Sequence, residues 1–524
     1  MKKIYCCLIL LFFNQTFSQA PGIDWQGTIG GYGYEYIYSV NPTFDGGYIL
    51  SGTSDSSNTM CDKTENCMGD LNIWVVKTDS LGNVEWENTL QADNFWAGGI
   101  IQQTSDGNYM VIGASNADIS GDKTEDSRGL TDLWLLKLDP LGNIIWQKTI
   151  GGSSQEGSGR LLELSDGYLI LSATYSPISG EITEGTHGSF DSWLLKIDFS
   201  GNIIWQKTYG GDLDDSFSFI LPMEDGGYLL CGASDSSISG NKTENSRGLI
   251  DYWIIKIDSV GNILWQKTIG GSEDDRASGI IKTTDGGYII VGNSYSPISG
   301  EKTVEGIYSE AWVIKIDAYG NILWQQSYGG DSADKLYNII ETLDGNFLLV
   351  GESASGISGD KTQVSRGDYD CWILKIDGLG NILWDKTIGG NNDDVGVNLV
   401  MDQIGGVLIG GQTFSGVYGD ITEGTCLNGS DYWLVKLEPE NLSTNLTLHS
   451  RSVVYPNPTT AVWQFETKSC IKSISVTDIS GKIVFFERFS AISGSINAEH
   501  LAAGMYFATI KTTAGSEVVK LIKN

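Results

Sequence analysis

The sequence predicts an all-β fold built from seven copies of one repeat, and two observations support this. First, the composition of 67 Gly, only 9 Pro, 16 Trp and 23 Tyr in 524 residues suits many short strands joined by tight turns. Second, two series of tryptophans run along the chain in step, with successive members 59 to 61 residues apart. One series is Trp25, Trp86, Trp146, Trp205, Trp265, Trp324 and Trp384; the other is Trp74, Trp134, Trp193, Trp253, Trp312, Trp372 and Trp433.

Each repeat contains four strand signals. In the fifth copy the first two, near residues 279–282 and 288–292, are joined by Asp-Gly-Gly, whose glycines accept the positive φ of a tight hairpin turn. The third and fourth, 311–317 and 322–327, are joined by another short turn. We therefore expect every copy to form a four-stranded antiparallel sheet.

The third strand of each copy is apolar on both sides of the pleat, as in the run that begins at Trp253. Neither face can be left in water, and radial packing of such sheets as blades covers both faces. The chain also begins with a lone fourth-strand signal around Trp25, and its last copy lacks that strand after Trp433. Residues 22–438 are therefore predicted to form a seven-bladed β-propeller, closed by the N-terminal strand; an open solenoid would not explain this complementarity.

The first 18 residues are predicted to be a signal peptide. Lys2 and Lys3 precede an apolar run from Ile4 to Phe13, and small or polar residues follow as far as Ser18. No later stretch approaches the roughly 18 apolar residues that would span a bilayer, so we expect no transmembrane segment. The formal charge of -32 repels phosphate groups, so nucleic acid and anionic membrane are not expected partners.

Six cysteines follow the predicted signal peptide. Cys61 and Cys67 flank the loop CDKTENC and are candidates for a small disulfide in an oxidising compartment. Cys231 and Cys371 fall within predicted strands, where we expect buried thiols that act as small hydrophobic groups. No partner is assigned to Cys426.

The repeat pattern changes completely after a linker at residues 439–452. Residues 453–524 contain Tyr455-Pro456-Asn457-Pro458, VTDISGK at 476–482, LAAGMY at 501–506 and KLIK at 520–523. This segment resembles the type A C-terminal sorting domain of the type IX (Por) secretion system of Bacteroidetes. The residues that carry the resemblance are Tyr455, Pro456, Asn457, Pro458, Asp478, Gly481, Lys482, Gly504, Tyr506 and Lys520.

The resemblance implies a small Ig-like β-sandwich that the outer-membrane translocon reads as an address. It also implies passage through the periplasm, followed by release or attachment to the cell surface. The repeat itself, with its pattern D-x-W-x-x-K-x-D-x-x-G-N-x-x-W, resembles bacterial propellers of the quinoprotein-like and kelch-like families. That likeness is one of architecture and names no ligand.

Six of the seven copies carry an acidic residue ten positions after the first-series tryptophan, where the chain enters the innermost strand. The positions are Glu35, Trp96, Glu156, Asp215, Asp275, Asp334 and Asp394. A ring of carboxylates near a channel mouth would bind Ca²⁺ or a cationic ligand. Alternatively, each acid accepts hydrogen bonds from the backbone of its own turn. The sequence leaves both interpretations open and makes no metal certain.

The loop between the second and third strands repeats a motif close to Ser-Gly-Asp-Lys-Thr-Glu. In copies two, four and six it continues to an Arg-Gly pair, at Arg128, Arg247 and Arg366. These arginines are candidates for binding carboxylated or sulfated glycans through bidentate hydrogen bonds. The alternative is that they form ion pairs with the acidic loop residues beside them. Tyr32, Tyr34 and Trp96 interrupt the pattern around the first copy, where they would stack on sugars or pack locally.

Enzymatic signatures are scarce. The three histidines, His187, His449 and His500, are scattered, and no catalytic triad, histidine-rich metal cluster or phosphate-binding loop can be assembled. Paired carboxylates suffice for glycoside hydrolysis, but nothing singles out one pair among seven near-equivalent loops.

We therefore expect a secreted or surface-attached monomer that acts as a binding or adhesion scaffold for an extracellular glycan, protein or cation. The near-equivalent repeats favour this hypothesis, because they build a multivalent surface more readily than one asymmetric active site. A hydrolase or lyase acting on a polysaccharide, and a structural component of a surface layer, are the alternatives.

Overall fold

A computed structural model describes residues 19–57, 61–93, 95–157, 159–306, 309–402, 405–426, 429–440, 453–455, 459, 461–478, 482–502, 504–512 and 516–523. The predicted signal peptide, residues 441–452 of the linker, Pro456, Asn457, Pro458 and Gly481 lie outside these residues. The chain divides into two compact units, Met1–Glu440 and Asn441–Asn524, and the division lies within the predicted linker. The described residues contain strands and no helix.

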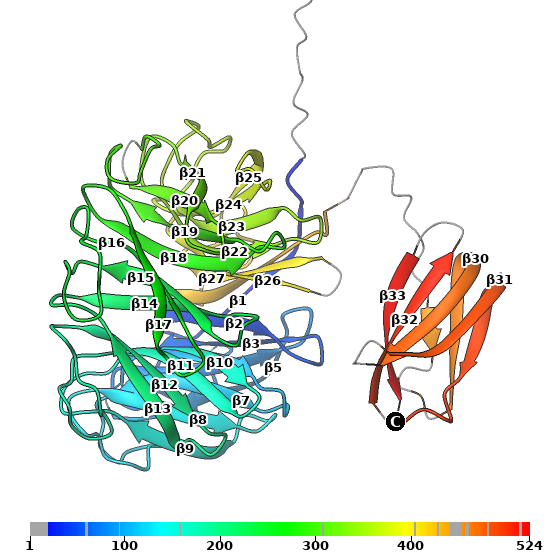
Figure 1. The fold of residues 1–524 in the computed structure, drawn as a ribbon, viewed down its shortest axis with the longest axis horizontal. Helices are drawn as coiled ribbons and strands as arrows, with labels where there is room; N and C mark the ends of the chain where they lie inside the picture. The colour runs from blue at the N-terminus through cyan, green and yellow to red at the C-terminus, as the bar shows by residue number, and fades with distance from the viewer. Residues whose placement is uncertain are drawn as a thin grey trace, which may run out of the picture. The chain divides into compact units, whose positions relative to one another are not determined.

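Seven four-stranded sheets make up the described part of the first unit (Figure 1). In six of them, four consecutive strands pair antiparallel in chain order. The first three blades are β2 (Glu35–Pro42), β3 (Tyr48–Ser54), β4 (Asn72–Thr78) and β5 (Val84–Leu90); β6 (Phe95–Gln103), β7 (Tyr109–Ser115), β8 (Asp132–Leu138) and β9 (Ile144–Ile150); β10 (Arg160–Leu164), β11 (Gly167–Thr174), β12 (Asp191–Ile197) and β13 (Ile203–Tyr209). The next three are β14 (Asp215–Pro222), β15 (Tyr228–Ser234), β16 (Asp251–Ile257) and β17 (Ile263–Ile269); β18 (Asp275–Lys282), β19 (Tyr288–Ser294), β20 (Glu310–Ile316) and β21 (Ile322–Tyr328); β22 (Asp334–Glu341), β23 (Phe347–Ser353), β24 (Asp370–Ile376) and β25 (Ile382–Ile388).

The seventh blade joins the two ends of the unit. Its first three strands are β26 (Asp394–Met401), β27 (Val407–Thr413) and β28 (Asp431–Leu437), and its fourth is the N-terminal strand β1 (Ile23–Ile29). The pairing is antiparallel, with Thr28 opposite Trp433. The prediction that the N-terminal strand completes the last blade is therefore confirmed.

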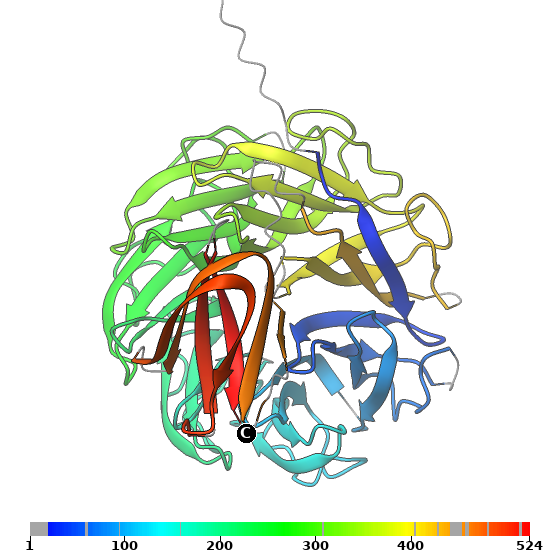
Figure 2. The same cartoon turned by 90° about the vertical axis from the view of Figure 1, so that its right-hand side faces the viewer.

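The blades close into a ring (Figure 2). In the described part of the first unit, a cluster of buried apolar side chains lies between each blade and the next. The cluster between the last blade and the first contains Leu408 and Leu434 on one side and Val40 and Leu50 on the other. Since every blade packs on two neighbours, the apolar second and third strands are covered on both faces.

The second-series tryptophans are buried on the third strands and bind the fourth strands. The indole Nε1 of Trp253 donates a hydrogen bond to Oε1 of Gln266 at 3.1 Å, and the equivalent bond recurs in the other blades. In the seventh blade Trp433 donates to Gln26 at 3.2 Å. A buried indole N–H needs an acceptor, and here the N-terminal strand supplies it.

The second unit contains five described strands, which form one connected sheet. They are β29 (Val453–Tyr455), β30 (Val462–Asp478), β31 (Ile483–Asn497), β32 (Gly504–Thr512) and β33 (Ser516–Lys523). The first half of β30 pairs with β29 and its second half with β32, while β31 pairs with β30 throughout. Trp463, Ile474 and Ile510 are among the buried core residues. The Ig-like form of this domain stays a prediction.

Candidate functional site

Two sets of loops share one end of the propeller, because strand direction alternates within each blade. They are the loops that enter each first strand and the loops between each second and third strand. Backbone hydrogen bonds join the two sets, as from Asn241 N to Gly210 O at 2.8 Å and from Glu301 N to Gly270 O at 2.9 Å. We call this end the long-loop face. The opposite end carries tight turns, in which Gly286 adopts a φ of 87°.

The carboxylates predicted to ring the channel mouth lie inside the turns that carry them. Asp275 is fully buried, and its Oδ2 accepts hydrogen bonds from Gly271 N at 2.6 Å and from Ser296 Oγ at 2.8 Å. The equivalent glycine and serine serve Glu35, Glu156, Asp215, Asp334 and Asp394.

The interpretation of these acids as an exposed ring is therefore wrong, since each caps its own turn. The side chain of Trp96 lies outside the described part of the chain. Within the described residues, no group of three or more His, Cys, Asp or Glu is arranged to hold a metal ion.

A second set of buried carboxylates begins the third strands, and the sequence analysis did not single it out. Asp251 accepts a hydrogen bond from Arg247 N at 2.5 Å, and its Oδ1 lies against Gly270, where an added Cβ would be 1.6 Å away. The first glycine of the Gly-Gly pair is therefore required by this contact. Equivalent positions hold Asn72, Asp132, Asp191, Glu310, Asp370 and Asp431. In the sequence, the recurring D-x-W pattern marks this acidic position, two residues before each second-series tryptophan.

The lysine of the loop motif lies between these two sets of carboxylates. Lys242 is 2% exposed, and its Nζ donates to Ser234 Oγ at 2.5 Å and to Ser246 Oγ at 3.1 Å. Burial lowers the pKa of Lys242, while the negative charges of Asp215 and Asp251 act to raise it. Lysines occupy the same buried place in four other blades, at Lys63, Lys123, Lys302 and Lys361.

Blades three and seven have an isoleucine at the lysine position, Ile182 and Ile421, and both are buried. In blade seven, burial raises the pKa of Asp394 to about 6 and that of Asp431 to about 7. The negative charge of Glu35 acts further to raise the pKa of Asp431. Neither blade has the lysine that the other blades place beside these acids; in blade three, Nδ1 of His187 lies 3.2 Å from Oδ2 of Asp191 instead.

Replacing Ile421 with Lys is expected to stabilise the protein at pH 8 by about 2 kcal/mol, and much less at pH 5. Raised pKa values mean that folded Asp394 and Asp431 hold more protons than in the unfolded chain, so their contribution to stability falls as pH rises from about 4 through 7. A buried ammonium group between the two carboxylates would remove this loss of stability at high pH. Thermal unfolding across this pH range measures the difference.

The matched control is Lys361→Ile, which gives blade six the arrangement of blade seven. This variant is expected to lose stability at pH 8 and to recover much of it at pH 5, because Asp334 and Asp370 would then face each other without Lys361. Stability differences that do not change with pH in either variant would contradict the explanation.

The three candidate arginines pair with acidic residues of the following blade, which is the alternative that the sequence left open. The pairs are Arg128 with Glu181 at 3.1 Å, Arg247 with Glu301 at 2.9 Å and Arg366 with Asp420 at 2.5 Å. Both partners in each pair are about one-third exposed, so each pair contributes about 0–1 kcal/mol. The arginines of the even blades thus join them to the odd blades.

Exposed tyrosines lie on the long-loop face in blades one, three and five, and blade seven has the half-buried Phe414 there. The residue directly after the second strand is Tyr175 in blade three, Tyr295 in blade five and Phe414 in blade seven. Tyr175 and Tyr295 are 41% and 54% exposed. In blade one, Tyr34 and Tyr36 stack with ring centroids 6.3 Å apart, and Phe414 lies 6.5 and 6.3 Å from them. Tyr32 and Tyr34, which the sequence singled out, are both exposed.

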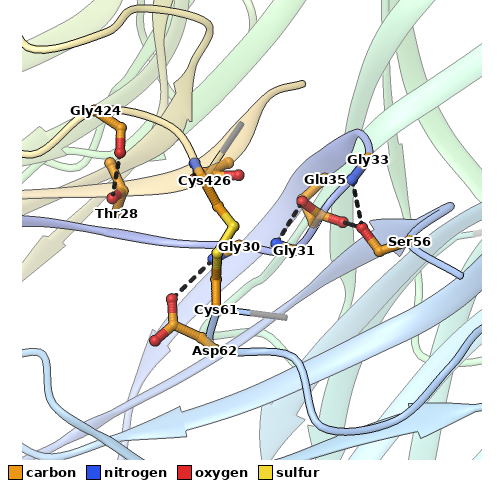
Figure 3. Close-up of a disulfide and its surroundings, with 11 residues drawn as sticks. Thr28, Gly30, Gly31, Gly33, Glu35, Ser56, Cys61, Asp62, Gly424 and Cys426 are labelled. Atoms are coloured by element: carbon orange, nitrogen blue, oxygen red, sulfur yellow. Dashed lines mark hydrogen bonds between the residues drawn. A yellow bond between two sulfur atoms is a disulfide. The ribbon is translucent and has the colours of Figure 1, made fainter. Parts of the chain in front are cut away.

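A disulfide joins Cys61 to Cys426 on this face (Figure 3), and Cys67 is free. The predicted pairing of Cys61 with Cys67 is therefore wrong. Cys67 takes the place of a loop serine, and its Sγ donates to the carbonyl oxygen of Ser54 at 3.0 Å, as Ser365 Oγ does to Ser353 at 2.7 Å. Its thiol is thus engaged with the end of the second strand.

Cys61 stands where the other six blades have glycine, at Gly121, Gly180, Gly240, Gly300, Gly359 and Gly419. These glycines have positive φ, and Cys61, with φ of 59°, is the one non-glycine residue with positive φ in the described chain. At another junction, a Cβ on Gly300 would lie 3.3 Å from Cβ of Arg247 in the preceding blade. The disulfide replaces this contact at the seam where the ring closes.

The described residues of the sorting motif lie in or beside the strands of the second unit: Tyr455 ends β29, Asp478 ends β30, Lys482 precedes β31, Gly504 begins β32, and Lys520 lies within β33. Tyr506 is 7% exposed, and its hydroxyl donates to the carbonyl oxygen of Ala502 at 2.9 Å. This tyrosine therefore holds the turn that precedes its own strand.

Comparison with known proteins identifies this unit. Residues 453–524 match the family model of the secretion system C-terminal sorting domain. The regulatory protein FlaEY of Caulobacter vibrioides is 21% identical over an alignment of 382 positions that covers 66% of this chain and 39% of that protein. The chain thus spans about two-fifths of the length of this relative. No helix among the described residues has the length and apolar character needed to cross a membrane.

Solved structures similar to the chain include several of low identity. The WD40 domain of Neurospora crassa Pan2 has 10% identity and a TM-score of 0.40, covering 77% of this chain and 89% of that one. The endosialidase of phage phi92 has 10% identity and a TM-score of 0.39, covering 95% and 88%. PorZ, a surface component of the type-IX secretion system of Porphyromonas gingivalis, has 11% identity and a TM-score of 0.19, covering 98% and 87%.

Proposed function

Because the chain ends in a secretion system C-terminal sorting domain, we propose that it is a propeller exported by the type IX system to bind an extracellular glycan on its long-loop face. The sorting domain implies export through the periplasm to the cell surface or the medium. One observation supports a glycan more than a protein or a cation as the ligand: exposed tyrosine rings recur on this face in blades one, three and five, at Tyr34, Tyr175 and Tyr295. Aromatic faces with water on one side are platforms for the apolar faces of sugar rings.

The arrangement of these platforms favours a multivalent binder over an enzyme. Exposed tyrosines in three blades around one ring would engage repeating units of a polymer, so that weak individual contacts add to a higher avidity. The formal charge of -32 favours a neutral or cationic glycan on this surface. The acids that a hydrolase would use as a pair are buried and bonded within their own turns, which argues against hydrolysis at these positions.

Glycan-array binding of the chain from Gln19 onward, with and without Ca²⁺, tests the proposal. Tyr175→Ala and Tyr295→Ala are each expected to weaken binding about tenfold, because each removes one stacking platform worth about 1.4 kcal/mol. The control is Tyr319→Ala, which removes a still more exposed tyrosine, at 76%, from a tight turn at the opposite end. Equal losses in Tyr319→Ala, or release of sugars without retained binding, would contradict the proposal.

A further inference from the structure

We propose that the central channel of the propeller holds a small organic carboxylate at Arg160. This inference concerns a site apart from the long-loop face and does not depend on glycan binding there. It comes from an unpaired cation, an unpaired amide donor and a cavity that all meet on the axis of the ring.

Two cavities occupy the channel, and Arg160 lines both. One, of about 390 Å³, is lined by residues of five blades, among them Ser39, Ile100, Arg160, Asn338 and Asn398. The other, of about 350 Å³, also takes in Tyr38, Ser218 and the long-loop residue Phe190. Because blades from around the ring contribute to each cavity, both lie along the axis. A volume of a few hundred Å³ suits a small-molecule ligand.

The guanidinium group of Arg160 has no carboxylate partner. Its Nε donates to the carbonyl oxygen of Ser218 at 3.2 Å, and its Cζ lies 5.0 Å from the ring centroid of Phe219. Among the described residues it makes no ion pair within 4.0 Å, and neither cavity is lined by Asp, Glu or Lys.

Burial lowers the pKa of Arg160, and no neighbouring charge offsets this effect. The residue is half-buried, and a guanidinium group does not lose its proton in proteins, so its charge stays without a carboxylate partner until an anion binds. In a chain with 65 acidic residues, a cation left without one of them is notable because partners are plentiful elsewhere on the molecule.

A second donor in the same cavity also lacks a partner. The Nδ2 atom of Asn398 is buried and makes no hydrogen bond to the described residues. Two unsatisfied donors call for a ligand that is rich in acceptors, and the planar fork of arginine matches a carboxylate in two parallel hydrogen bonds. Ile100, Leu161 and Met401 line the rest of the cavity, so the ligand would carry a partly apolar body.

The residues that face the channel differ from blade to blade, whereas the outer strands of the blades repeat closely. Four residues after the turn position of the acidic set, the seven blades have Ser39, Ile100, Arg160, Phe219, Gly279, Asn338 and Asn398. Blade three departs further, because β10 begins only at Arg160 and has 5 residues, after a Gly159 whose added Cβ would be 2.1 Å from the carbonyl oxygen of Leu171. Because only blade three places a cation, Arg160, at this position, we expect one ligand to bind on the axis.

Thermal unfolding of the chain from Gln19 onward, titrated with sodium glucuronate and sodium benzoate, tests this site. Glucose and sodium sulfate are the neutral and inorganic comparisons. We expect at least one carboxylate to raise the unfolding temperature in a saturable way. In Arg160→Gln the response should weaken at least tenfold, while the ligand-free variant should be about as stable as the wild type, because no ion pair is lost and glutamine keeps an N–H donor.

Further variants keep the test decisive. Arg160→Lys keeps the charge but not the planar fork, so its affinity for the carboxylate should also fall at least tenfold. This variant tests the proposal if Arg160→Gln does not fold. Arg276→Gln, an exposed arginine outside the two channel cavities, and Tyr295→Ala should respond like the wild type. No response to either carboxylate, a response to sulfate alone, or an unchanged response in the Arg160 variants would overturn the proposal.

Discussion

Removing residues 19–30 is expected to prevent folding or to cost more than about 5 kcal/mol, because it takes the fourth strand from the seventh blade. Ile29 is 3% exposed, and the ring of Trp25 packs against Gly82 of the first blade, where an added Cβ would lie 2.7 Å away. Without β1, the edge of β28 is unpaired and the indole of Trp433 loses Gln26. Circular dichroism during heating, compared with the chain from Gln19 onward, measures the loss.

A synthetic peptide of residues 20–31 provides the positive control for this truncation. It is expected to restore the unfolding temperature when added in excess, since the strand makes its contacts without needing the covalent link. Gln26→Ala in the full chain is the matched point variant and should cost only about 1 kcal/mol, because it removes one hydrogen-bond acceptor. A truncated chain that unfolds at the same temperature as the full chain would show that β1 does not close the ring.

Loss of the bond between Cys61 and Cys426 is expected to cost about 3–5 kcal/mol. The two cysteines are 365 residues apart, so the bond removes much conformational freedom from the unfolded chain. It also joins the first blade to the last at the closing junction of the ring, which the covalent chain otherwise crosses only between β1 and β2. The unfolding temperature should fall to a similar extent in Cys426→Ser and in the wild type treated with a reducing agent.

Two substitutions at Cys61 separate the bond from the backbone. Cys61→Gly and Cys61→Ser both lose the disulfide, but glycine suits the φ of 59° and should recover about 1 kcal/mol relative to serine. The engineered pair Arg247→Cys with Gly300→Cys places cysteines at the same contact between blades four and five, and should oxidise readily. An unchanged unfolding temperature after reduction would show that the disulfide between Cys61 and Cys426 does not stabilise the closed ring.

The sequence predicted much of the fold because each blade is specified locally. The paired tryptophans, the Asp-Gly-Gly turns and the apolar third strands all lie within about 60 residues, and they were enough to predict seven sheets and the exchanged strand β1. The candidate site was harder to predict. Asp275 and its equivalents stood at the expected turn, but whether a carboxylate faces a channel or its own backbone depends on the turn geometry, which residue spacing does not report.

The burial of the loop lysines is a second feature that residue spacing did not predict. In the sequence Lys242 and Lys361 belong to a polar loop motif, and the motif does not report whether its lysines are buried. In the structure they are 2% exposed between two carboxylates, since the loop folds back over its own blade. Ile421 stands at the lysine position of blade seven, and only the structure shows that its burial leaves Asp394 and Asp431, both with raised pKa, without a lysine beside them.

The sequence by itself determined the number of blades, the strands of each blade, the closing role of the N-terminal strand and the sorting domain at the end of the chain. These features rest on patterns that repeat or sit within one segment. Only the tertiary structure decided which atoms meet across blades: Cys61 with Cys426 rather than Cys67, and Arg160 with an axis that holds no acid among its lining residues. Such contacts join residues far apart in the chain, and closing the ring is what brings them together.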